Sequence, residues 1–134
     1  MMKLFDDLKS YASNAGYGFR YDRMPRVVFL EGSIEGREVT IMVSCPAVAE
    51  TRVVLYTGFE FNAGAKEWAE LNALGVEISG IRTVALPVVG SSRQVALIAD
   101  VSGHNSLSVR VIDAIGKLLA VYHENRSRIA EICR

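Results

Sequence analysis

The sequence predicts a single α+β domain over residues 1–134, in which helices pack on one antiparallel sheet of five strands. Strand-like segments occur in two runs, three and then two, with a short helical segment between the runs. Amphipathic helical segments stand near both ends of the chain. Strands that alternate singly with helices, as a doubly wound α/β fold requires, do not occur. The expected order of elements is therefore α-β-β-β-α-β-β-α.

The first helix is expected over residues 4–15, where apolar residues recur at helical spacing and leave one polar face. Asp6 and Asp7 lie near its start, where the helix dipole favours acidic side chains. Gly16 follows its end, as a left-handed C-terminal residue often does. The stretch GYG (16–18) is interpreted as a break before the first strand.

The first run of strands is expected at residues 26–32, 37–45 and 51–61, which are rich in β-branched and aromatic residues. The second of these alternates apolar and polar residues cleanly, as a half-buried strand does. Residues 33–36 are short and contain glycine, so the first two strands should form a hairpin. Pro46 should end the second strand, because proline cannot donate to a ladder.

The middle of the chain predicts a short helix and a second hairpin. The helix is expected to begin at Asn62, as an N-cap, and to end at Gly75. Residues 82–89 and 93–102 follow as two strands joined by a glycine–serine turn. Pro87 places the first of these two strands at a sheet edge or a bulge.

The last and longest element is expected as a helix over residues 107–132, whose apolar residues recur in steps of three and four. Asn105 or Ser106 should cap its start by accepting from the unpaired N–H groups of the first turn. Asp113 and Lys117 are spaced for a weak favourable ion pair on its polar side.

Composition excludes several classes of function. Fifteen basic residues balance fifteen acidic ones, so a dedicated nucleic-acid binder is not expected. Cys45 and Cys133 lack metal-ligand spacing and are too few for a disulfide scaffold, and no metal or cofactor is expected. The start of the chain does not resemble a signal peptide, and no apolar run is long enough to cross a bilayer. We therefore expect a cytoplasmic protein without a membrane partner.

The stretch IADVSGHNS (98–106) carries the residue types of a small hydrolase. Strand alternation places Asp100 and Ser102 on one face, and His104 follows after Gly103, so a serine–histidine–aspartate contact is conceivable. Catalytic triads are normally assembled from distant segments, and no GxSxG elbow occurs here. A turn leading into the last helix explains the same residues better. An enzymatic activity therefore stays open but is not favoured.

Several strand segments are apolar on both faces, namely VVFL (27–30), VVLY (53–56), TVAL (83–86) and VALIA (95–99). A sheet with one layer of helices leaves its other face open, and an open face this apolar would be unusual for a monomer. We therefore predict a homodimer that buries a strand face or edge. A groove at the dimer seam would be the place for a protein segment or a small apolar ligand.

The candidate binding residues are the apolar and aromatic residues of these segments and of the short helix: Val28, Leu30, Tyr56, Phe59, Phe61 and Trp68. An internal pocket near Trp68 and Phe59 would make the protein a small-molecule-binding regulator, which is the main alternative function. Ordinary core packing is the competing interpretation of the aromatic cluster, and the pattern favours it.

This order of elements resembles the type III secretion chaperone-like superfamily, which includes the secretion chaperones and bacterial sensory-transduction-regulator-type domains. The resemblance spans nearly the whole chain and is closest over EWAELNALG (67–75), VALIADVS (95–102) and SVRVIDAIGKLLAVYHENRSRI (108–129). Asn72 matches an asparagine that is frequent in the family's short helix. The resemblance implies a non-enzymatic, homodimeric, bacterial binding domain. The neutral charge departs from the acidic secretion chaperones and points to the other branches.

Overall fold

The computed structural model describes residues 2–23, 26–45, 51–62, 81–103 and 106–133, together with 66, 67, 69–71 and 73. The six residues of this last group are helical. In chain order the bounds of the other elements are α1 (Met2–Ala15), β1 (Gly18–Asp22), β2 (Val27–Ile34), β3 (Arg37–Ser44), β4 (Thr51–Asn62), β5 (Arg82–Pro87), β6 (Ser92–Val101) and α3 (Leu107–Ile132).

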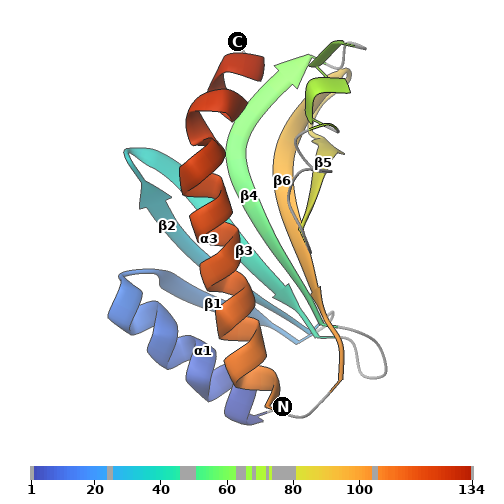
Figure 1. The fold of residues 1–134 in the computed structure, drawn as a ribbon. Helices are drawn as coiled ribbons and strands as arrows, with labels where there is room; N and C mark the ends of the chain where they lie inside the picture. The colour runs from blue at the N-terminus through green and yellow to red at the C-terminus, as the bar shows by residue number, and fades with distance from the viewer. Residues whose placement is uncertain are drawn as a thin grey trace.

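The strands form one antiparallel sheet in the order β1-β2-β3-β4-β6-β5 (Figure 1). The α+β class is confirmed, but the sheet has six strands and not the five that the sequence predicts. The predicted order was wrong at one place, because a fourth strand precedes the middle helical residues. Both edges of the sheet are short strands, β1 and β5, and β5 lies at the edge as Pro87 predicts.

The missed strand is β1, which follows the stretch that was interpreted as a break. Gly16 does end α1 in a left-handed conformation (φ 79°), and Tyr17 N–H donates to Ala12 O at 2.8 Å. Phe19 and Tyr21 of β1 then pack against the core, although no β1 residue is fully buried. A five-residue edge strand without a buried residue gives only a weak alternating pattern, so it escaped prediction.

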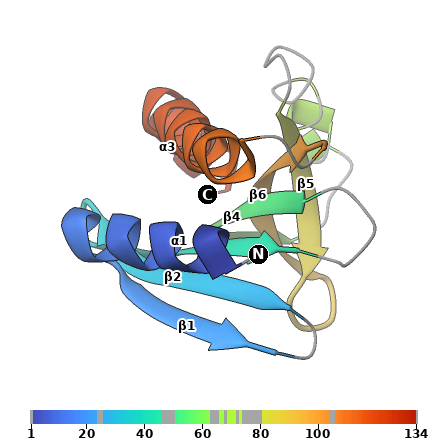
Figure 2. The same ribbon diagram turned by 90° about the horizontal axis from the view of Figure 1, so that it is seen from below.

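Both long helices cover the same face of the sheet, as Figures 1 and 2 show from two directions. The core lies between this face and the helices, and the stripe of α3 that faces it is fully buried at Val111, Ile115, Leu118, Tyr122 and Ile129. α3 has the bounds that its periodicity predicts. Because one side of α3 is buried, the spacing of its apolar residues was sufficient to predict where this helix begins and ends.

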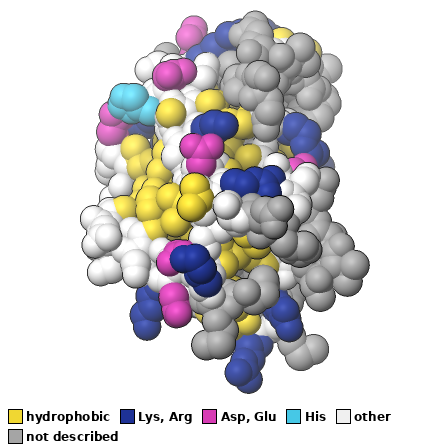
Figure 3. Space-filling model, turned by 60° about the horizontal axis from the view of Figure 1, so that its bottom comes forward, with side chains coloured by type: hydrophobic (Ala, Val, Ile, Leu, Met, Phe, Trp, Pro, Cys, Tyr) yellow, Lys and Arg dark blue, Asp and Glu magenta, His cyan; other side chains and the backbone are white. Residues whose placement is uncertain are grey.

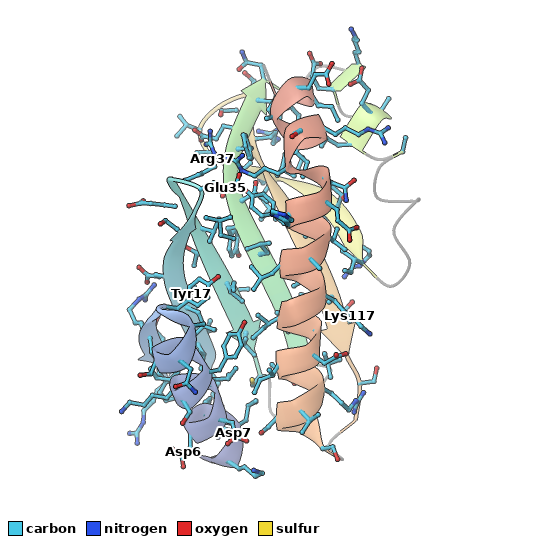
Figure 4. The ribbon with its side chains drawn as sticks, turned by 60° about the vertical axis from the view of Figure 1, so that its left-hand side comes forward. Asp6, Asp7, Tyr17, Glu35, Arg37 and Lys117 are labelled. Atoms are coloured by element: carbon cyan, nitrogen blue, oxygen red, sulfur yellow. The ribbon has the colours of Figure 1, made fainter. Side chains whose placement is uncertain are left out.

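The helix surfaces carry opposite charges in pairs. Lys117 contacts Asp113 at 3.3 Å, as the spacing predicts, and Lys3 contacts Asp7 at 3.2 Å on α1. Figure 4 shows Asp7 and Lys117 on their helices, and Figure 3 shows hydrophobic side chains gathered between charged groups of both signs. The mixture of signs on this face agrees with the balanced composition.

Two predicted helix caps differ from the structure. Asn62 is the last residue of β4 and not a helix N-cap, because the strand continues one residue beyond its expected end at residue 61. Ser106 occupies the N-cap position of α3, but it adopts a left-handed conformation (φ 55°) and its side chain makes no capping hydrogen bond. Asn105, Trp68, Asn72 and Gly75 lie outside the described residues.

A bulge in β4 bends the centre of the sheet. From Tyr56 to Glu60 β4 advances four residues, while β6 advances only two, from Ala96 to Gln94. The insertion of an even number of residues preserves the alternation of inward and outward side chains. The residues of β4 beyond the bulge therefore keep the same face toward the helices.

Side chains satisfy the backbone of this bulge where the ladder is interrupted. Thr57 Oγ1 donates to Val95 O at 2.7 Å and accepts from Phe59 N–H at 3.2 Å. Gly58 N–H donates to the side-chain oxygen of Gln94 at 3.1 Å. Gly58 itself has φ 77°, which an L-residue with a side chain rarely adopts. The bulge is thus a hydrogen-bonded feature of the fold.

The bulge also opens a fork in the sheet. Among the described residues, β3 pairs with β4 only over Thr40–Ser44, whereas its first residues continue to pair with β2 as far as Arg37. The β2–β3 hairpin therefore diverges from the upper half of β4, and α3 passes beside the opening (Figure 1). We refer to this divergence as the sheet fork.

We predict that Gly58→Ala destabilises the protein by at least about 1–2 kcal/mol, because a β-carbon there is strained at positive φ. This carbon would also lie 3.0 Å from Glu38 O, a backbone atom that cannot easily move away. Urea unfolding followed by circular dichroism measures the difference.

Gly116→Ala is the matched control, because Gly116 is exposed within α3 and a β-carbon there meets nothing within 4 Å. It should stabilise the protein by about 0.5–1 kcal/mol through helix propensity. Equal unfolding midpoints for wild type and Gly58→Ala would refute the role assigned to this glycine.

Candidate binding site on the open sheet face

The sheet face opposite α1 and α3 carries a second hydrophobic cluster. Its members are Val54, Ala96 and Ile98, which are buried, and Met42, Tyr56, Val84 and Leu86, which are partly buried. We call these seven residues the open-face patch. None of the described helical residues belongs to this cluster. The alternation predicted for residues 93–102 is confirmed, because Val95, Leu97, Ala99 and Val101 lie in the helix-covered core instead.

The apolar surface becomes more exposed toward the β5–β6 turn. Val84 and Leu86 are half-buried, whereas Val88 is 43% exposed and Val89 is 78% exposed. Val88 N–H donates to Ser92 O at 3.0 Å, so this residue still belongs to the hairpin. The edge strand thus presents apolar side chains at alternate positions next to the patch.

An ion-pair cluster borders the opposite end of the patch. Asp100 pairs across the strands with Arg52, whose Nε donates to Oδ1 at 2.9 Å. Nη2 of Arg82 donates to Oδ2 at 2.8 Å. The hydrogen bond from Arg52, together with the positive charges of both arginines, holds the pKa of Asp100 below its usual value. Both oxygens of this carboxylate are thus engaged by arginines.

This arrangement bears on the residues of the hydrolase hypothesis. Asp100 faces the open side of the sheet with its arginine partners, and Ser102 is exposed just beyond the end of β6. His104 lies outside the described residues. The structure therefore assigns Asp100 to a surface ion-pair cluster that links β4, β5 and β6.

A hollow of about 620 Å³ adjoins the patch at Tyr56 and wraps around the sheet fork. Gly58 of the bulge also lines it, together with residues of the β2–β3 turn, β3, β6 and α3: Glu35–Glu38, Thr40, Gln94 and Arg126. Tyr56 is the one residue shared by the described patch and this hollow.

Arg37 closes the helix side of the fork. Its guanidinium carbon lies 3.8 Å from the centroid of the Phe59 ring, and Nη1 donates to Gly58 O at 3.3 Å. Its Nε is buried, and no described residue accepts from it. Figure 4 shows Arg37 and Glu35 at the tip of the β2–β3 hairpin, against α3. A flat cation over an aromatic ring and a carbonyl acceptor together hold this side chain in one orientation.

Arg126 connects α3 to the same hairpin. Its Nη1 lies 2.6 Å from Oε2 of Glu35, and the arginine side chain is only 27% exposed. Its Nε is also buried without an acceptor among the described residues. Glu35 and Gly36 both have positive φ, 50° and 82°, as a tight hairpin turn requires. The ion pair therefore ties the turn to the C-terminal half of α3.

The predicted binding residues fall on two different faces. Val28, Leu30, Phe59 and Phe61 lie in the helix-covered core with 0–7% exposure, so they contact the helices and other core residues. Tyr56 is half-buried on the open face, and its hydroxyl lies 3.7 Å from Met42 Sδ. Trp68 lies outside the described residues. The structure thus places Tyr56 apart from the four residues with which it was grouped.

Of the open-face patch, only Tyr56 is among the candidate binding residues, although the segments predicted to be apolar on both faces contain six of its seven residues. Sequence reasoning missed both arginines of the hollow. No pattern in the sequence connects Arg37 with Arg126, because they meet only through the packing of α3 beside the fork.

The described residues contain no group of three or more histidine, cysteine, aspartate or glutamate side chains able to hold a metal ion. Cys45 and Cys133 are free thiols. Burial raises the pKa of Cys133 to about 11, although nearby Arg37 opposes the shift. No helix in the described part of the chain is long and apolar enough to cross a membrane.

Comparison with known proteins gave no match to any protein-family model, curated protein or solved structure. The candidate site is therefore defined by its own geometry, which comprises an apolar patch, a border of paired charges and a polar hollow. The patch and the hollow meet at Tyr56, and the paired charges border the far end of the patch.

We predict that Asp100→Asn lowers the free energy of unfolding by up to about 1 kcal/mol at neutral pH, because both arginines are half exposed and their pairs are screened. The pKa of Asp100 is lower in the folded protein than in the unfolded chain. The stabilisation is therefore present above the unfolded pKa and lost as the pH falls through the folded pKa. Urea unfolding at about pH 7 and about pH 3 measures the change.

Asp113→Asn provides the control, because Asp113 forms an ion pair with exposed Lys117 on the surface of one helix. Its effect should stay below about 0.5 kcal/mol. If the loss for Asp100→Asn persisted undiminished at low pH, it would have to come from something other than these ion pairs.

Proposed function

We propose that the protein is a non-enzymatic, cytoplasmic binding domain that forms a homodimer through the open-face patch and holds a protein segment. One observation carries the proposal: a second apolar cluster lies on the sheet face away from α1 and α3. The partly buried members of this cluster and the exposed Val88 and Val89 leave apolar area on this face, as contact surfaces do. The fold-level resemblance to chaperone-like domains implies the same kind of activity.

The anatomy of this surface supports a protein partner. The central residues Val54, Ala96 and Ile98 are at most 8% exposed, so the area gained on binding comes from the half-buried residues around them. The charges of Arg52, Arg82 and Asp100 border this apolar centre. An apolar centre with a polar rim is the usual composition of a protein interface.

A second copy of the chain is the partner that we propose for the patch. A two-fold axis through the patch would bring the same residues of both copies into contact, as in most homodimers. The β5–β6 turn would extend the contact through Val88 and Val89, which are the more exposed residues of this surface. The hollow beside Tyr56 would then lie at the edge of the dimer seam, where a partner segment could bind.

We expect wild-type protein to sediment as a dimer at micromolar concentration, and we expect Leu86→Asp to weaken the dimer at least about tenfold. The reason is that a carboxylate placed in an apolar contact must be desolvated without a partner. Val88→Asp, at a more exposed position, tests the same surface with less risk to folding. Sedimentation velocity over a concentration series measures both variants.

Val109→Asp is the matched control, because Val109 is 70% exposed on α3, away from the open face. It should leave the dimer unchanged. A wild-type protein that stays monomeric throughout the series, or a dimer that tolerates both open-face variants, would contradict the proposal.

A further inference from the structure

We propose that the hollow at the sheet fork is a binding site for a carboxylate, which the guanidinium groups of Arg37 and Arg126 hold together. The hollow adjoins the proposed dimer contact at Tyr56, but the proposal does not depend on the dimer. It begins from the observation that two arginines, one from β3 and one from α3, line the same hollow. Paired arginines are the usual protein partners of planar oxyanions.

Among the described residues, these two arginines have few hydrogen-bond acceptors. A guanidinium group has five N–H donors. Arg37 uses one of them for Gly58 O, and Arg126 uses one for Glu35. The Nε groups of both arginines are buried and have no acceptor among the described residues. Arginines in such surroundings gain by a further acceptor within reach of their terminal nitrogens.

The local charge also favours an anion. On the helix side of the fork, two arginines face a single carboxylate, that of Glu35. Glu38 also lines the hollow, but strand alternation places it on the opposite face of β3 from Arg37. Among the described lining residues, the helix side thus holds two guanidinium groups and one carboxylate in partly buried surroundings, where charge interactions are stronger than in water.

The arginines are already oriented before a ligand binds. Arg37 is fixed by the Phe59 ring and by the bulge carbonyl, and Arg126 is fixed by the hairpin turn. Little side-chain entropy would be lost on binding. The hollow beside them has a volume of about 620 Å³. The site therefore combines guanidinium donors, fixed orientation and space.

The carboxylate of Glu35 is itself an example of the group that we expect the site to bind, and it would compete with a ligand for Arg126. Its carboxylate already lies on Arg126, while its backbone stands at positive φ, where glycine or asparagine is preferred. The side chain is 52% exposed and can move into solvent. An incoming carboxylate would share or replace its contact with Arg126, so removal of the Glu35 charge should strengthen ligand binding.

The test is a titration of ¹⁵N-labelled protein with sodium acetate at constant ionic strength, followed through the arginine Nε–H signals by NMR. We expect saturable shifts of the Arg37 and Arg126 signals. Acetamide, which has the same shape without the charge, should cause none. Arg20 is the control signal, because it pairs with Glu31 and Asp22 on the surface, away from the hollow.

Two variants sharpen the result. Glu35→Gln should bind acetate roughly fivefold more tightly, the change equivalent to about 1 kcal/mol for the loss of an exposed competing ion pair. Arg126→Gln should abolish the saturable shift, and Arg126→Lys, which keeps the charge and the fold, should weaken it. The proposal fails if Arg37 and Arg126 shift no more than Arg20, or if Glu35→Gln leaves the affinity unchanged.

Discussion

The contact between Arg37 and the bulge in β4 is the constraint on which the rest of the structure depends. Two extra residues in β4 turn the strand away from β3, and Gly58 takes a conformation that other residues rarely adopt. Side chains of Thr57, Gln94 and Arg37 supply the hydrogen bonds that the interrupted ladder lacks. Without the bulge, β3 and β4 would pair along their full length, and neither the sheet fork nor the hollow would exist.

The two faces of the sheet then take different roles. The helix-covered face receives the large aromatic and aliphatic residues, including Phe59 and Phe61, and supplies most of the buried area. The open face retains a smaller cluster that merges with the edge strand β5 and its exposed turn. Tyr56 joins this cluster to the hollow, so the two proposed contact surfaces meet at one residue.

Prediction from the sequence succeeded wherever one periodic pattern governs an element. The apolar stripe of α3 and the alternation of Val95–Ala99 arise because one side of a regular helix or strand is buried. Such burial leaves a periodic pattern of apolar residues that can be recognised in a single sequence. Prediction failed where the apolar pattern of a segment is weak, or where its structure depends on contacts with residues distant in the chain. β1 has no buried residue, and Ser106 begins α3 without the side-chain cap that its type suggests.

The sequence by itself determined the class of fold, the bounds of the last helix and the alternation of residues 93–102 between the two faces of the sheet. Only the tertiary structure decided which of those faces the helices cover and where β3 leaves β4. It alone brought Arg37 and Arg126 to one hollow. The physical reason is that periodicity is a local property of the sequence. It indicates whether a side chain is buried, but not which distant residue buries it. The sheet fork depends on contacts between segments that lie far apart in the chain.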